Sequence, residues 1–359
     1  MGSSTSILKQ KKSTTVQKYL PTTFQPVVIK CAEGSPAQIQ LKSGITIQST
    51  CLGCIDQPCM RFSESELKLG GVFKDFPADQ DAEVCATKAI SWDDDKKKPV
   101  IDNQSCILCG VCMNRCPAKA IFYKDGMLSV AAGSSEYFMD AKSAPEMLLA
   151  EKTQKALAVT ESIGGLININ KDALEESYRR LIEVAKTMSP QFPNLLSRNL
   201  MNCIGLKSAI RRRGDVYSRT DLVFYHGQKC GLCEVEFFQT VMLETPRSIL
   251  DDMAVYISRY QQKKDQISPL IIGLELPNQR SEFWQVIADI KKVQNIQIST
   301  LTIGAMFMLV WAQKTITSEA ESLPYGDSSN YSIKMGVDHL LGNVYQCSSA
   351  SYSYFEAGK

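Results

Sequence analysis

Residues 106–117 read CILCGVCMNRCP, with four cysteines spaced C-x2-C-x2-C-x3-C and a proline directly after the last. Thiolates are soft ligands that bind iron well, and this spacing is typical of a four-iron cluster. A zinc site would show two paired C-x2-C knuckles instead. The stretch therefore predicts an iron–sulfur site, in which Pro117 ends the run and the fourth sulfur points away from the first three.

A second group of cysteines precedes this stretch. Residues 51–59, CLGCIDQPC, hold three cysteines spaced C-x2-C-x4-C, and Cys85 follows in VCATKAI. That tail nearly copies RCPAKAI around Cys116. The chain therefore holds two versions of one unit, at 51–90 and 106–121, each with three clustered cysteines and a distal fourth followed by a short strand.

This arrangement resembles the two-cluster bacterial ferredoxin over residues 45–130. In that family the fourth cysteine of each unit binds the other cluster. The resemblance implies two [4Fe–4S] clusters, one held by Cys51, Cys54, Cys59 and Cys116 and the other by Cys85, Cys106, Cys109 and Cys112.

The first unit departs from the ferredoxin pattern in three ways. Four residues precede its third cysteine, an insert runs from Met60 to Val84, and Ala86 stands where the family has proline. We expect the insert to lie over one cluster, where it would shield the cluster or contact a partner.

Composition limits the classes of protein that remain. The 359 residues carry 13 cysteines, and no secretory pattern follows Met1, so the cysteines indicate metal binding in a reducing cytoplasm rather than disulfides. No run approaches the roughly 18 apolar residues of a membrane helix, and the longest, 303–312, predicts a buried element. The net charge of +2 leaves only a local patch, such as Arg211-Arg212-Arg213, to attract nucleic acid.

The remaining residues predict an α+β protein of several domains. Apolar periodicity predicts a mixed sheet with helices packed on it. The expected elements are a helix at 171–188, a β-hairpin at 220–238, a helix at 248–260, a strand at 268–276, a helix at 281–293 and a strand at 296–303. The predicted domains are an extension at 1–44, a ferredoxin-like domain at 45–130, a linker at 131–165, an α/β domain at 166–320 and a tail at 321–359, expected as surface strands or a flexible end.

Three acids fall in the predicted hairpin. Asp221 opens its first strand, and Glu234 and Glu236 stand two residues apart on the second, so the glutamates share a face. The hairpin length predicts an imperfect register that requires a bulge or an irregular sheet end. Three nearby carboxylates would repel one another without a cation, and their hard oxygens suit Mg²⁺.

The order helix, hairpin, helix, strand resembles the PD-(D/E)xK nuclease superfamily, the fold of many restriction endonucleases, over residues 166–312. By that resemblance Asp221 is a metal ligand, and Glu234-Val235-Glu236 is the (D/E)-x-K element with Glu236 in place of lysine. The general base is then Glu236, a metal-bound water or a lysine from elsewhere in the chain such as Lys229. An acid of the first helix could complete the site, the candidates being Glu175, Glu176 and Glu183.

The nuclease resemblance implies hydrolysis of phosphodiester bonds in double-stranded DNA. One or two Mg²⁺ or Mn²⁺ ions, bound by Asp221 and Glu234, would activate a water and stabilise the scissile phosphate. Basic residues just upstream of the acids could contact the phosphate backbone, namely Lys207, Arg211, Arg212, Arg213 and Arg219.

Other interpretations stay open. The chain could be a ferredoxin-type electron-transfer protein whose larger domain docks to a redox partner, or a DNA-binding protein without catalysis, and the acids could simply face solvent. Cys203, Cys230 and Cys233 could form a third metal site or a redox pair, although buried structural thiols are the simpler interpretation. A homodimer is also left open.

Overall fold

The computed structural model describes two compact units. The described residues are 51, 53–54, 56–116, 120–124, 126–130, 171–215, 218–237, 244–316, 321–326, 328–342 and 355–357. The first unit comprises the described parts of Met1–Arg61, Lys88–Cys106 and Cys112–Leu166, and the second comprises those of Phe62–Thr87, Ile107–Val111 and Ile167–Lys359. The predicted extension at 1–44 and linker at 131–165 lie outside the described residues.

This division differs from the predicted domain boundaries. The insert that follows Cys59 and the loop that follows Cys106 group with the α/β part of the chain rather than with the remaining ferredoxin-like residues. Each is a short segment whose neighbours along the chain belong to the first unit. Part of the predicted ferredoxin-like domain is therefore built into the second unit.

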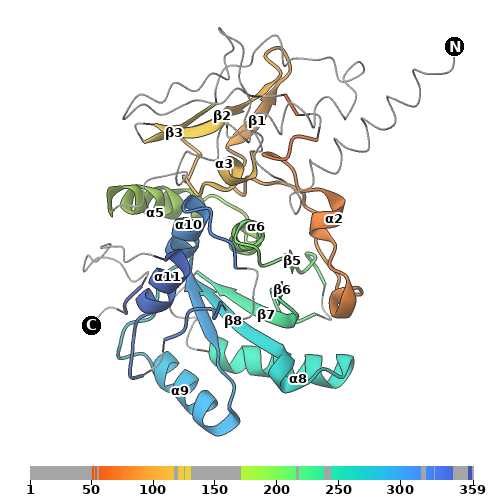
Figure 1. Cartoon of the computed structure of the whole chain (residues 1–359), viewed down its shortest axis with the longest axis vertical. Helices are drawn as coiled ribbons and strands as arrows, with labels where there is room; N and C mark the ends of the chain where they lie inside the picture. The colour runs from red at the N-terminus through yellow and green to blue at the C-terminus, as the bar shows by residue number, and fades with distance from the viewer. Residues whose placement is uncertain are drawn as a thin grey trace, which may run out of the picture. The chain divides into compact units, whose positions relative to one another are not determined.

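The first unit contains two small antiparallel hairpins (Figure 1). In one, β1 (Ile90–Asp93) pairs with β2 (Lys98–Ile101), and in the other, β3 (Ile121–Lys124) pairs with β4 (Met127–Val130). The expectation that a short strand follows each distal cysteine is confirmed, because β1 begins five residues after Cys85 and β3 five residues after Cys116. The short helix α3 (Val111–Arg115) ends one residue before Cys116.

The second unit is built on a five-stranded mixed sheet. Its strands, in spatial order, are β5 (Ser208–Ile210), β6 (Leu222–His226), β7 (Lys229–Glu236), β8 (Ile267–Gly273) and β9 (Ser299–Thr302). The first three pair antiparallel, and the last three pair parallel. The predicted mixed sheet is confirmed, and so is the hairpin that holds the acids.

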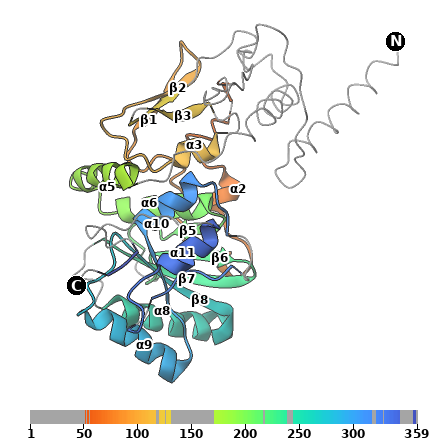
Figure 2. The same ribbon diagram turned by 60° about the vertical axis from the view of Figure 1, so that its left-hand side comes forward.

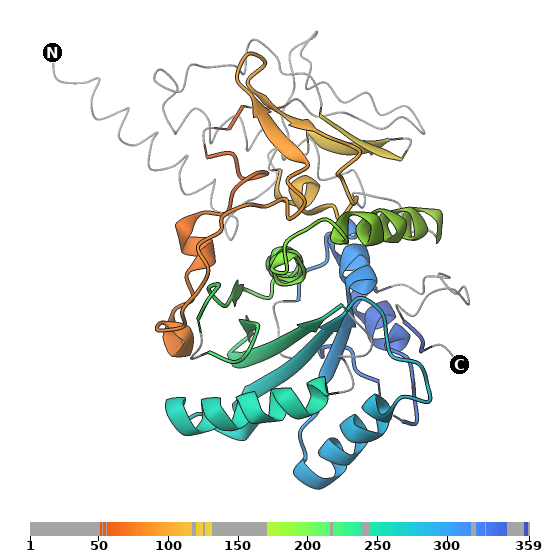
Figure 3. The same ribbon diagram turned by 180° about the vertical axis from the view of Figure 1, so that it is seen from behind.

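Helices cover both faces of this sheet. On one face lie α8 (Thr245–Tyr260) and α9 (Glu282–Gln294), which form the connections between the parallel strands (Figures 1 and 2). On the other face lie α6 (Phe192–Cys203) and α10 (Ile303–Trp311), as the view from behind also shows (Figure 3). Every residue of α10 is buried, which confirms the buried element predicted from the apolar run at 303–312.

Two further helices belong to the second unit. The predicted first helix is α5 (Lys171–Ala185), and α11 (Lys334–Leu341) lies in the region expected as surface strands or a flexible end. That expectation is wrong for this part of the tail, because Ile333, Val337 and Leu340 are buried at helical spacing. Among the described residues, no helix is both long and apolar enough to cross a bilayer.

The insert after Cys59 extends the edge of the sheet. It begins with the helix α2 (Glu64–Leu67) and the turn η1 (Gly71–Phe73), and then forms an antiparallel bridge between Ala78 and Arg211, just beyond β5. The backbone N–H of Asp79 donates to the carbonyl of Ile210 at 2.9 Å. The structure therefore gives the insert a partner that the sequence did not indicate, namely the open edge of β5.

A buried arginine holds the end of the insert. Arg198 of α6 is fully buried, and its guanidinium donates to the carbonyls of Asp81 at 2.6 Å and Glu83 at 3.4 Å. Asn199 beside it donates to the carbonyls of Glu83 at 3.0 Å and Val84 at 2.9 Å. Buried carbonyls need donors, so this pair of side chains stabilises the segment that leads into Cys85.

We predict that Arg198→Met destabilises the protein by about 3 kcal/mol or more, because each hydrogen bond from a charged donor contributes roughly 1.5–3 kcal/mol. The midpoint of urea unfolding measures the loss. The control is Arg179→Met, because Arg179 pairs with acids on an exposed part of α5 and should cost under about 1 kcal/mol. Equal losses for the two variants would contradict the role assigned to Arg198.

Candidate functional site

Four predicted cluster ligands line one pocket of the first unit. Cys51, Cys54, Cys59 and Cys116 share it with mostly apolar side chains, namely Gln57, Pro58, Trp92, Pro99, Ala120, Ile121 and Val130. Three of the four thiols are buried, and that of Cys54 is half-buried. The structure thus brings together the ligand set that the ferredoxin resemblance implies for the first cluster.

The electrostatics of this pocket suit a cationic group. Burial raises the pKa of Cys51, Cys54 and Cys59 above that of a free thiol, and the nearby sulfur of Cys116 raises all three further. Four thiolates this close would repel one another in an apolar pocket. The iron ions of a cluster supply the missing positive charge, so the residues present fit such a group.

Backbone contacts fix the pocket. The Arg115 guanidinium donates to the carbonyls of Pro58 at 2.8 Å and Arg61 at 3.2 Å, which joins α3 to the first cysteine motif. The backbone N–H of Ala120 donates to the sulfur of Cys116 at 3.2 Å. Hydrogen bonds to ligand sulfurs are one of the features that set the potential of an iron–sulfur cluster.

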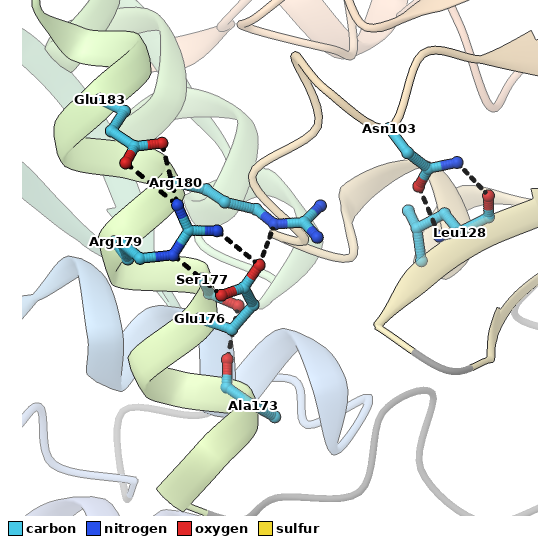
Figure 4. Close-up of polar contacts among 8 residues, drawn as sticks. All are labelled: Asn103, Leu128, Ala173, Glu176, Ser177, Arg179, Arg180 and Glu183. Atoms are coloured by element: carbon cyan, nitrogen blue, oxygen red, sulfur yellow. Dashed lines mark hydrogen bonds and ion pairs between the residues drawn. The ribbon is translucent and has the colours of Figure 1, made fainter.

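The loop before Cys106 is pinned to a strand of the same unit. The side-chain amide of Asn103 donates to the Leu128 carbonyl at 3.0 Å, and its oxygen accepts the Leu128 N–H at 2.8 Å (Figure 4). One amide thus satisfies both backbone groups of a β4 residue. This fixes the chain just ahead of the second cysteine motif.

The other four predicted iron ligands are Cys85, Cys106, Cys109 and Cys112. This ligand set stays a prediction from the sequence.

The loop that carries Cys109 is part of the second unit's core. Leu108 is fully buried, and its carbonyl accepts a hydrogen bond from the Trp311 indole at 3.0 Å. Gly110 has a φ of +80°, and a Cβ at this position would lie 2.9 Å from the Trp311 ring. Glycine is therefore required here both by its backbone conformation and by the indole beside it.

A pair of carboxylates faces each other across the hairpin. Strands β6 and β7 pair without interruption from the Leu222–Cys233 pair to the His226–Lys229 pair, and a two-residue turn joins the strands. Continued by one residue, this register sets Asp221 opposite Glu234. The bulge or irregular sheet end predicted from the hairpin length is wrong, because Gly227 adopts a φ of +60° and allows a tight turn.

Asp221 is held by donors on three sides. Its Oδ2 accepts the backbone N–H of Val235 at 3.1 Å, and its Oδ1 accepts the Asn194 amide at 3.1 Å. The Arg211 guanidinium lies 3.7 Å from Oδ1. Burial nonetheless raises the pKa of Asp221 above its usual value.

Glu234, Glu236 and Asp252 complete an acidic cluster around Asp221. Burial raises the pKa of Glu234 well above its usual value, and a hydrogen bond with Asp252 and the surrounding acids raise it further. Burial, followed by the charge of Asp221, raises the pKa of Glu236 to about 7. Burial also raises the pKa of Asp252. The arrangement is a mostly buried group of four carboxyls, two from the hairpin strand β7.

Sequence reasoning missed Asp252 and Asn194. A signal for Asp252 existed, because it falls within the apolar stripe of α8, three residues after Ile249 and four before Tyr256. An acid on the buried face of a helix needs a partner, so its position pointed to another polar group in the sheet. No comparable signal marked Asn194.

The acids predicted on the first helix lie elsewhere. Glu176 bonds to Arg179 at 2.8 Å and to Arg180 at 2.6 Å, and these hydrogen bonds lower its pKa to about 2 (Figure 4). Glu183 pairs with Arg179 at 3.0 Å on the same helix. Glu175 is half-buried on α5. The carboxyls that act on Glu234 are those of Asp221, Glu236 and Asp252, and none of these three helix acids is among them.

The predicted basic residues divide into two groups. Arg211 contacts Asp221, and the positive charge of Arg219 lowers the pKa of Asp252, so both lie at the acidic cluster. Lys229 starts β7, five residues from Glu234, or about 16 Å along an extended strand, and is therefore remote from the acids. Of the rest, Lys207 donates to the Ser65 carbonyl at 3.1 Å, and Arg212 and Arg213 are exposed.

Three further cysteines fit the structural alternative. Cys203, Cys230 and Cys233 are all buried. Cys230 and Cys233 stand three residues apart on β7, so their side chains leave opposite faces of the strand. In the part of the chain that the structure describes, no three His, Cys, Asp or Glu side chains are arranged to hold one single metal ion. The thiols of a four-iron cluster need not meet at one point, since each binds a different iron.

Comparisons with known proteins concern the cysteine-rich region. The family model of the 4Fe-4S dicluster domain matches residues 82–120. A protein of Pyrococcus furiosus named as the polyferredoxin-like subunit of an aliphatic sulfonate oxidoreductase is 29% identical over 80 residues, which is 22% of this chain. The chain spans about a third of that relative's length, since the match covers 34% of it. No solved structure matches.

These findings support iron–sulfur clusters and the ferredoxin-like half of the sequence analysis. The matched residues include Cys85, Cys106, Cys109, Cys112 and Cys116. The nuclease resemblance has no counterpart among the comparisons and stays a prediction.

We predict that Gly110→Ala lowers the iron content and the thermal midpoint of the protein, because the new methyl group meets the Trp311 ring and the backbone is strained by about 1–2 kcal/mol. Iron analysis and thermal unfolding measure both effects. Gly126→Ala is the matched control, since Gly126 has a φ of +78° but open space around its Cβ position. If both variants lose equal amounts of iron, the contact with Trp311 does not support the loop.

Proposed function

We propose that the chain transfers electrons through two [4Fe–4S] clusters, as a ferredoxin-type component of a larger redox system. The observation that carries the proposal is the set of four cysteine thiols gathered in one apolar pocket. The match to the dicluster domain and the similarity to a polyferredoxin-like subunit support the same function. The partner would be a redox protein.

The spacing of the ligands favours electron exchange between the clusters. The backbone N–H of Cys116 donates to the carbonyl of Cys112 at 3.1 Å, so the two residues are one helical turn apart, or about 6 Å along the axis. In the cross-ligated arrangement these two cysteines bind different clusters. The clusters would then be immediate neighbours, which suits the passage of electrons from one to the other.

We predict that the anaerobically purified protein holds about eight iron atoms per chain, as two four-iron clusters require. Cys116→Ser should remove about four or more of them, because it takes away a ligand of the first cluster and disturbs α3. The matched control is Cys203→Ser, which changes a buried thiol outside both predicted ligand sets. Iron and sulfide analysis measures the loss, and a Cys116→Ser variant with its full iron content would refute the ligand assignment.

A separate observation favours a second function, hydrolysis of phosphodiester bonds in double-stranded DNA. It is the acidic cluster of Asp221, Glu234 and Glu236 on a hairpin that continues through α8 into the parallel strand β8. In this proposal Asp221 and Glu234 hold Mg²⁺ or Mn²⁺, and the cation activates the attacking water. Glu236 is the candidate base, because a pKa near the working pH suits a group that accepts a proton.

We predict that plasmid DNA is cut in the presence of Mg²⁺ or Mn²⁺ and that Asp221→Asn abolishes the cutting. Glu236→Gln should lower the rate by about 10²-fold or more. The wild-type rate should fall as the pH drops below about 7, because protonated Glu236 cannot accept the proton of the attacking water. The control is Asp251→Asn, which changes an exposed acid on α8. If the wild-type protein cuts no DNA substrate with either cation, the hydrolysis proposal fails and electron transfer stands alone.

A further inference from the structure

The pocket of the four thiols disfavours the charge that electron transfer brings to it. Reduction of a [4Fe–4S] cluster adds one electron, so the site becomes more negative by one unit of charge. Most of the side chains that share the pocket with the four cysteines are apolar. Apolar surroundings stabilise charge poorly, which lowers the reduction potential of a buried cluster. Positive side chains close to the pocket would offset this effect.

Arg115 brings a guanidinium to this pocket. It ends α3 and directly precedes the predicted ligand Cys116. Its side chain is half-buried and donates to the carbonyls of Pro58 and Arg61, which lie on either side of the predicted ligand Cys59. Both acceptors are uncharged, so these two bonds position the cation without neutralising it. Burial is the largest effect on the pKa of Cys59 and raises it, whereas the positive charge of Arg115 lowers it, so this charge acts on the ligand sulfur.

Lys98 brings a second cation to the same pocket. It begins β2 and is half-buried, and the next residue, Pro99, lines the pocket. Burial raises the pKa of Cys51, whereas the positive charge of Lys98 lowers it. One acid acts in the opposite sense, because the negative charge of Asp56 adds to the effect of burial in raising the pKa of Cys54. Asp56 is exposed, so water and salt screen its charge more than those of the two half-buried cations.

We propose that Arg115 and Lys98 raise the reduction potential of the first cluster, whose predicted ligands are Cys51, Cys54, Cys59 and Cys116. Two positive charges beside the pocket stabilise the added electron, because it makes the cluster more negative. The cluster then accepts electrons from a weaker reductant than an apolar pocket alone would allow. This inference rests on the proposed electron transfer and names two residues that adjust it without binding iron.

The test is a redox titration of the full, cluster-loaded chain with dithionite, followed by electron paramagnetic resonance. Arg115→Gln and Lys98→Gln each remove one positive charge, and each should shift one of the two midpoint potentials to a more negative value. We expect a change of up to tenfold in the ratio of reduced to oxidised cluster, which corresponds to about 59 mV for one electron. Arg115→Lys keeps the charge and should retain most of the wild-type potential.

The matched control is Lys96→Gln. Lys96 lies on the turn between β1 and β2, where its exposed side chain pairs with Asp93. Solvent screens such a charge, so its removal should leave both potentials unchanged. Iron analysis of every variant separates the loss of a charge from the loss of a cluster. Should Arg115→Gln lose iron, the comparison of Lys98→Gln with Lys96→Gln still tests the effect of a charge beside the pocket.

The outcomes separate this inference from the electron-transfer proposal. Reversibly reduced clusters whose potentials are unchanged in Arg115→Gln and Lys98→Gln would overturn the inference and keep electron transfer. A shift of equal size in Lys96→Gln would also overturn it, because net charge rather than position would then set the potential. Clusters that cannot be reduced reversibly in the wild type would remove electron transfer and the inference together.

Discussion

The buried guanidinium of Arg198 is the contact on which the organisation of the second unit depends. With Asn199 it supplies donors to the carbonyls of residues 81–84, directly before the predicted iron ligand Cys85. The same helix, α6, provides Asn194 to Asp221. One helix therefore holds both the approach to a cluster ligand and the central acid of the second unit. The segment that leads into Cys85, a residue of the ferredoxin-like motif, is therefore held by a helix of the α/β part of the chain.

The local parts of this arrangement could be predicted from the sequence. Cysteine spacing specifies the chemistry of the metal by itself, because neighbouring ligands must share one cluster. The two-residue period of β7 placed Glu234 and Glu236 on one face, and the structure shows both in the acidic cluster. The all-apolar run of α10 likewise identified a buried element.

The long-range parts could not be predicted in the same way. The helix α6 was missed because Arg198 and Asn199 are fully buried, which breaks the apolar stripe that marks a helix. The pairing of Ala78 with Arg211 joins residues far apart in sequence, and nothing in either stretch indicates the other. Asp252 was overlooked as an ordinary helix acid, although its place in the apolar stripe set it apart from its exposed neighbour Asp251.

The two proposed functions use opposite ligand chemistry. Soft thiolates of the first unit suit iron, and hard carboxylates of the second suit Mg²⁺ or Mn²⁺, so one chain can hold both kinds of site. The comparisons favour electron transfer. Hydrolysis is supported by the position of the acids alone. Its proposed metal ligand Asp221 lies beside Arg211, which also forms the bridge that joins the insert to the sheet.

The most direct test of the electron-transfer account is a redox titration of the anaerobic protein followed by electron paramagnetic resonance. The account predicts two [4Fe–4S] clusters that are reduced reversibly. When both are reduced, their signals should be broadened by magnetic coupling, because ligands of the two clusters are one helical turn apart at Cys112 and Cys116. A protein whose cysteines hold zinc, or whose clusters cannot be reduced reversibly, would contradict it.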